Sequence, residues 1–138
     1  MNKILAILIF LALLLTGCQK NTSDHDTWGN KHNINTGDIS EIVIQNVKGT
    51  DVILPQKEII SFMKAINGGR YNIGKLDIRP PDYSVKITLK NGKTRGLSIW
   101  GADLFVDHDD NGHYQFVLSE NERTKVTDIL NKAESVEK

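Results

Sequence analysis

The fold class is decided by one stretch of sequence, Tyr83-Ser84-Val85-Lys86-Ile87-Thr88-Leu89, which continues through Asn91-Gly92 into Thr94 to Trp100. In its first part apolar residues alternate with polar ones, which is typical of a β-strand with one buried face. Asn-Gly is the strongest short-range hairpin signal, because both residues tolerate the positive φ angles of a tight turn. The stretch therefore predicts two antiparallel strands.

Upstream of this segment the chain predicts another hairpin followed by a helix. Ile39 to Val47 and Thr50 to Leu54 are rich in β-branched residues and flank the turn signal Lys48-Gly49. From Gln56 to Asn67 apolar residues recur at spacings of three and four, and Gly68-Gly69 follows as a stop signal. We expect an amphipathic helix that lies on a sheet.

Downstream of the segment we expect a further hairpin and a closing helix. Leu104 to Val106 and His113 to Leu118 flank the turn-rich Asp109 to Gly112. Ser119-Glu120-Asn121-Glu122 fits the S-x-x-E capping box, and apolar residues at helical spacing follow it. The predicted fold class is α+β, an antiparallel β-sheet of hairpins with two amphipathic helices packed on one face.

The N-terminal residues predict export and lipidation. Met1-Asn2-Lys3 is a short positive region, and Ile4 to Leu15 is an unbroken apolar run. As a helix this run reaches only ~18 Å, which is short of the ~30 Å hydrocarbon core of a bilayer. It ends in Leu15, Thr16, Gly17 and Cys18, which resembles the bacterial lipobox. That resemblance implies cleavage before Cys18 and a diacylglycerol on its thiol.

The alternative is an ordinary secretory signal with a cysteine near its cleavage site by chance. Cys18 is the only cysteine in the chain, so no intramolecular disulfide is possible, and acylation explains a single exported thiol more easily. Two or three acyl chains together anchor a protein firmly. We therefore expect an extracytoplasmic lipoprotein held on the cell membrane.

Composition sets the expected domain boundaries. The signal peptide is residues 1–17, a flexible lipidated tether is residues 18–37, a single α+β domain is residues 38–134, and a C-terminal tail is residues 135–138. Trp28 is expected to be an isolated exposed residue of the tether, and His25 and His32 to be solvent-exposed. Loss of Lys3 leaves 16 basic against 17 acidic residues, so nucleic acid is not an expected partner.

These features together resemble the YhfM-like domain of small Gram-positive lipoproteins. The resemblance rests on the lipobox, the tether, the Ile-rich hairpin and the first helix. It rests further on Pro80-Pro81-Asp82-Tyr83, on Asn91-Gly92-Lys93, on the strand that ends in Trp100, and on the helix after Leu118-Ser119. It covers most of the domain and implies a fold and a membrane location, but no catalytic residue and no mechanism.

One acidic turn carries the candidate metal ligands. Residues 107–112 fit D-x-D-x-N-G, the first half of a calcium loop, but the glutamate that would complete it is replaced by Leu118. An acidic turn is the first interpretation, and a weak Ca²⁺ site helped by Asp103 or Glu120 is the second. Two histidines on the same hairpin suggest zinc or copper as a further hypothesis. The candidate ligands are Asp107, Asp109, Asn111, His108 and His113, and no other cofactor is expected.

Function is predicted less directly. There is no G-x-S-x-G, S-x-x-K or phosphate-binding loop, and Ser98 lies in mid-strand, so we expect no enzyme. The leading prediction is a module that binds a protein, peptide or envelope component through its open sheet face and residues 102–113. A Ca²⁺- or metal-responsive envelope protein and a small hydrolase without a recognised motif are the alternatives. The candidate binding residues are Trp100, Phe105, Tyr83 and Tyr114, for which simple packing is the competing interpretation.

Overall fold

The computed structural model describes residues 27–71, 79–109 and 112–135, without the side chains of residues 109–114. Cys18, the rest of the predicted lipobox and His25 lie outside the described residues. The elements in chain order are α2 (Trp28–His32), η2 (Thr36–Asp38), β1 (Ile39–Asn46), β2 (Asp51–Ile53), α3 (Gln56–Asn67), β3 (Arg70–Tyr71), β4 (Tyr83–Leu89), β5 (Thr94–Trp100), β6 (Leu104–Asp109), β7 (Gly112–Val117) and α4 (Glu120–Ser135).

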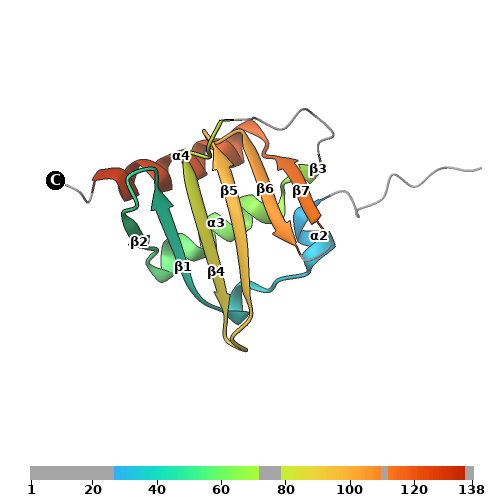
Figure 1. The fold of residues 1–138 in the computed structure, drawn as a ribbon. Coiled ribbons are helices and arrows are strands. Elements are labelled where there is room, and N and C mark those ends of the chain that lie inside the picture. Colours follow the sequence, from blue (N-terminus) through green and yellow to red (C-terminus); the bar gives the residue numbers. More distant parts are fainter. Residues whose placement is uncertain (1–26, 72–78, 110–111, 136–138) are drawn as a thin grey trace, which may run out of the picture.

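The strands form one seven-stranded sheet in the order β2-β1-β4-β5-β6-β7-β3 (Figure 1). Neighbouring strands pair antiparallel throughout. β4 and β5 pair across Asn91-Gly92, with Tyr83 opposite Ile99 and Gly92 at a φ of 85°. The predicted α+β class with an antiparallel sheet is confirmed. The long-range pairing of β3 with β7 at one edge has no local sequence signal.

The helix α3 begins and ends where local signals placed it, and α4 begins at its predicted cap. α3 covers the predicted residues and is followed by Gly68. The capping box before α4 is formed, since Ser119 N–H donates to Glu122 Oε2 at 3.1 Å and Glu122 N–H donates to Ser119 Oγ at 3.4 Å. α3 and α4 contact each other, and both run behind the strands in the view of Figure 1.

The core joins both helices to alternate residues of the central strands. Its members include Phe62 and Met63 from α3, Leu130 from α4, and Ile87 and Ile99 from the sheet. Burial of this apolar surface is the main favourable term in folding. None of the helices in the part of the chain that the structure describes is long and apolar enough to cross a membrane.

Two expectations for the N-terminal segment are wrong. Trp28 has 0% of its surface exposed and belongs to the core, and the His32 side chain is only 4% exposed. Trp28 N–H donates to Gly69 O at 2.7 Å, which brings α2 against the end of α3. A polar stretch can thus pack on a domain when its one large apolar side chain finds cover far along the chain. Residues 27–37, placed by sequence in the tether, include α2 and η2 and so belong to the folded part of the chain.

Candidate functional site

A buried carboxylate organises the junction between α2 and the sheet. Asp107 lies on β6 with no exposed surface. Its Oδ2 accepts from Trp28 Nε1 at 3.0 Å and from Arg95 Nη1 at 3.1 Å, and lies 2.7 Å from His32 Nε2. We call these four residues the Asp107 cluster. It ties α2 to β5 and β6 through contacts that span most of the chain.

The cluster keeps Asp107 ionised although it is buried. Burial by itself would raise the pKa of this carboxyl, but the bond with His32 and the charge of Arg95 outweigh it and lower the pKa below the usual 3.8. Asp107 Oδ1 is buried and has no hydrogen-bond partner among the residues that the structure describes. The carboxylate therefore depends on the donors gathered at its other oxygen.

The structure does not bring the candidate metal ligands Asp107 and His108 together. Successive side chains of a strand point to opposite faces, so Asp107 faces the core while His108 lies on the other side of the sheet, with its Nε2 2.7 Å from Ser98 Oγ. An oxygen that already accepts two hydrogen bonds and has a third nitrogen 2.7 Å away is poorly suited to bind a cation. Within the described residues, no group of three or more His, Cys, Asp or Glu could hold a metal ion. The side chains of Asp109, Asn111 and His113 lie outside the description.

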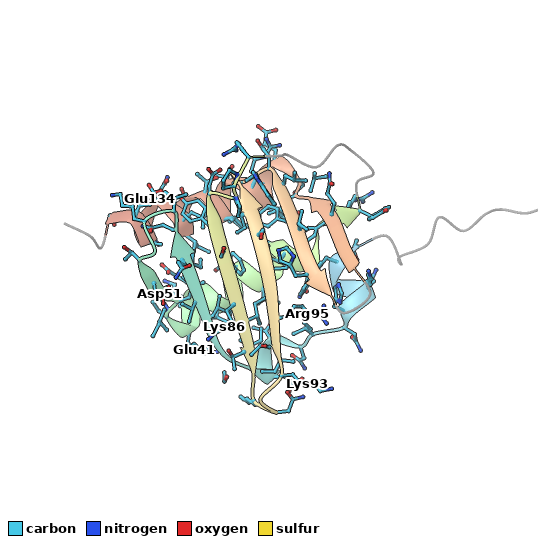
Figure 2. All side chains as sticks on the ribbon, in the orientation of Figure 1. Glu41, Asp51, Lys86, Lys93, Arg95 and Glu134 are labelled. Carbon is cyan, nitrogen blue, oxygen red and sulfur yellow. The ribbon has the colours of Figure 1, made fainter. Side chains whose placement is uncertain are left out.

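A polar groove of about 930 Å³ lies next to the Asp107 cluster. It is lined by residues 32–35, Asp38 and residues 89–95, so it runs between the end of α2 and the β4–β5 turn. Lys90, Lys93 and Arg95 line it together with one acidic residue, Asp38. The charge of Arg95 is offset by Asp107, whose Oδ2 lies 3.1 Å away, so Lys90 and Lys93 are the basic residues that remain without that offset. Figure 2 shows Lys93 and Arg95 at this end of the sheet and Glu134 at the opposite end. We call this feature the basic groove.

The predicted aromatic binding residues do not share one face. Phe105 has no exposed surface and stacks on Phe116 with ring centroids 5.2 Å apart, so it is a core residue and lines no exposed face. Trp100 is 8% exposed, and its Nε1 donates to Arg79 O at 2.8 Å. Both residues therefore fit the interpretation that competed with ligand binding, which is simple packing. The side chain of Tyr114 lies outside the described part of the chain.

Tyr83 lies at a small pocket at the other end of β4. Its hydroxyl donates to Glu134 Oε1 at 2.5 Å, and both residues line a pocket of about 310 Å³ beside α4. Burial, followed by the bond to Glu134, raises the pKa of Tyr83 well above its usual value. The phenol is therefore neutral at physiological pH and acts as a donor that ties β4 to α4.

The contact of Ser98 with His108 is the arrangement nearest to a catalytic pair. Ser98 Oγ and His108 Nε2 are within the distance at which a histidine can activate a hydroxyl. The two residues come from adjacent strands, with Ser98 opposite Val106 in the register, so the contact runs diagonally across the β5–β6 pair. Neither lies at a strand-to-helix turn, where a nucleophile of this kind is usually presented.

Sequence reasoning missed the residues that build the groove and its floor. A usable signal was present in the strands. Arg95 lies two and four residues before the buried Leu97 and Ile99, and Asp107 lies two residues after the buried Phe105, so each charged residue is on the same strand face as core residues. Charged residues in step with core positions need partners of opposite charge. Trp28 and His32 carried no such pattern, since their partners lie far away in the sequence.

The fold and these polar contacts define a small α+β domain with an N-terminal helix docked onto its sheet. The chain belongs to the YhfM family: the model of that family, described as YhfM protein, matches residues 35–136. The family predicted from the sequence is thereby confirmed. The match begins after α2, so Trp28 and His32 lie outside it. No curated protein and no solved structure matches the chain.

Proposed function

We propose that this YhfM-family protein is a lipid-anchored lipoprotein on the extracytoplasmic face of the cell membrane. The observation that carries this proposal is the apolar run that ends in Leu15, Thr16, Gly17 and Cys18. A second support is that Cys18 is the only cysteine, so acylation gives the single thiol of an exported protein a use. The lipid would hold the domain at the membrane surface, where any binding takes place.

We further propose that the domain is a non-enzymatic module that binds a protein, peptide or envelope component through one face of its sheet. In this proposal α3 and α4 pack together on the opposite face, as their shared core with alternate strand residues suggests. Ser84 and Lys86 alternate with the buried residues of β4 and are exposed. An antiparallel sheet covered by helices on one side leaves its other side available for contact.

The anchoring proposal is tested by mass analysis of the mature protein isolated from membranes. The expected mass is that of residues 18–138 plus a diacylglycerol thioether, with or without a further acyl chain. A Cys18→Ala variant should leave the membrane fraction, because it offers no thiol for acylation. An unmodified thiol in the mature protein, or full membrane retention of the variant, would rule out the lipid anchor.

The binding proposal is tested by site-specific photocrosslinking in intact cells. A photoreactive residue at Lys86 reports on the open sheet face, and one at Lys125, which is exposed on α4, is the matched control. We expect a discrete crosslinked partner from position 86 and none from position 125. Identical crosslinking patterns from the two positions would argue against recognition through the sheet.

A small hydrolase is the second candidate function, and the 2.7 Å contact between Ser98 and His108 is the observation that favours it. A hydroxyl activated in this way should react with a fluorophosphonate probe. Labelling of the wild type that is lost in Ser98→Ala, with Ser84→Ala as the control on the adjacent strand, would support the hydrolase. Absence of labelling in the wild type would leave the contact as a cross-strand hydrogen bond.

A further inference from the structure

We propose that the basic groove docks onto anionic phospholipid headgroups of the membrane that carries the Cys18 anchor. The domain would then lie with the β4–β5 turn and the end of α2 against the bilayer. This inference rests on the proposed membrane anchoring and adds to it an orientation and a ligand chemistry, the phosphate groups of anionic lipids.

Charge is unevenly distributed over the molecule. The whole chain is neutral, with 17 basic and 17 acidic residues, whereas the groove at one end of the sheet is lined by Lys90, Lys93 and Arg95 with Asp38 as its acidic residue. Asp107 offsets the charge of Arg95, and the groove is still basic by one charge. Lys90 and Lys93 flank the Asn91-Gly92 turn and are exposed, so their ammonium groups can reach a surface. Basic residues near a membrane are attracted to its anionic lipids by about 1 kcal/mol each.

Only a short stretch of chain separates the proposed anchor from the groove. Trp28 is buried in the core, so the connection between Cys18 and the folded domain ends at Thr27. From Cys18 to Thr27 there are nine peptide units, which extend to ~30 Å at most. α2 then leads directly into residues 33–35, which line the groove. The short tether therefore keeps the groove near the headgroups at a high effective concentration, so that a weak contact is populated.

The groove itself assigns the contact to its two lysines. Arg95 Nη1 is 3.1 Å from Asp107 Oδ2 and His32 Nε2 is 2.7 Å from the same atom. These two side chains are held at the floor of the groove by the buried carboxylate. Lys90 and Lys93 line the groove from the hairpin and are exposed. Asp38 is the acidic residue of the lining, and its backbone oxygen accepts from Lys90 N–H at 2.8 Å. The lysines are therefore the residues that should contact lipid phosphate.

The experiment attaches the mature chain, residues 18–138, to vesicles through its single thiol and a maleimide lipid. Vesicles of phosphatidylcholine are compared with vesicles that also contain phosphatidylglycerol, and the rate of lysine acylation by a water-soluble reagent is measured by mass spectrometry. Lys48 and Lys125 are internal controls, since Lys48 follows β1 at the end of the sheet where β4 begins and Lys125 lies on α4.

We expect Lys90 and Lys93 to react about fivefold more slowly on anionic vesicles, which is the factor given by ~1 kcal/mol for a basic residue at such a surface. The control lysines should react equally on both. The protection should disappear at ~1 M salt, where the Debye length is ~3 Å. Equal rates for Lys90 and Lys93 on the two kinds of vesicle would overturn the proposal.

Hydrogen exchange of residues 89–95 gives a second measurement that also works for variants without the lysines. Protection on anionic vesicles should be lost in the double variant Lys90→Ala/Lys93→Ala and kept in Lys48→Ala/Lys125→Ala, which has the same net charge. Protection by soluble glycerol phosphate on neutral vesicles would assign the groove to a free phosphate ligand and overturn the membrane contact. Because the thiol is coupled chemically, the outcome does not depend on whether the cell acylates Cys18.

Discussion

Replacing Trp28 with alanine tests whether α2 belongs to the folded domain. The indole has no exposed surface, its Nε1 donates to Asp107 Oδ2 at 3.0 Å, and its ring lies 6.1 Å from that of Phe116 between centroids. The residue therefore combines apolar burial with a hydrogen bond to a buried carboxylate, and the two contributions can be separated by substitution.

The expected loss follows from those two contributions. Truncation of a buried Trp to Ala costs about 3–5 kcal/mol of unfolding free energy, from lost burial and the cavity left behind. Trp28→Phe keeps a ring in the core but removes the donor, and a hydrogen bond to a charged group is worth about 1.5–3 kcal/mol. Against a total stability of about 5–15 kcal/mol for a domain, the alanine variant should lose a large share of its unfolding free energy.

Urea unfolding of the mature chain measures the stability of both variants. Unfolding is followed by the circular dichroism of the backbone rather than by tryptophan fluorescence, because the variants lack one indole. Asn30→Ala is the control, because Asn30 is exposed on the same short helix and such substitutions usually change stability by less than about 0.5 kcal/mol. An unfolding midpoint for Trp28→Ala equal to that of the control would refute the reasoning and return residues 27–37 to the tether.

Three further substitutions test other contacts by the same unfolding assay. The lowered pKa of Asp107 means that the unfolded state takes up protons more readily in acid, so the unfolding free energy of the wild type should decrease as the pH falls through 3.8 and below. Asp107→Asn should be less stable at neutral pH, but its stability should decrease less steeply in acid; an equally steep decrease would contradict this. Gly69→Ala should cost about 1–3 kcal/mol, because a Cβ would overlap the Phe116 ring; a neutral effect would show that the ring has room to move. Tyr83→Phe should cost about 1 kcal/mol by removing the hydrogen bond to Glu134. Because the pKa of Tyr83 is raised in the folded protein, its stabilising contribution is present below pH 10 and is lost as the pH rises further, so the stability of the variant should depend less on alkaline pH.

Much of the fold was predictable because its signals are local. The helix Gln56–Asn67 follows from apolar spacing and a glycine stop, and the start of α4 follows from Ser119 and Glu122 three residues apart. The turn at Asn91-Gly92 follows from the tolerance of Gly92 for a positive φ, here 85°, although Asn91 does not share that conformation and residues 90–93 connect the strands. Each of these patterns depends on neighbours within one or two turns of the chain, so the sequence displays it directly.

The candidate site was not predictable in the same way. Asp107 was expected at an acidic turn open to cations, yet it faces the core and meets Trp28, which is 79 residues away. His32, on the same helix as Trp28, and Arg95, on β5, meet the same oxygen. Whether a charged residue on a strand is buried or solvated depends on which partners the sheet brings to it, and the strand order is set by the whole core.

The amino-acid sequence by itself determined the α+β class, the order of the elements from β1 to α4 apart from β3, and membership of the YhfM family. Only the tertiary structure decided that α2 is part of the domain, that Asp107 is its buried attachment point, and that Lys90, Lys93 and Arg95 gather at one groove. The physical reason is the range of the interactions. Backbone periodicity and capping act between near neighbours, whereas burial and charge pairing act between residues that only the completed sheet places in contact.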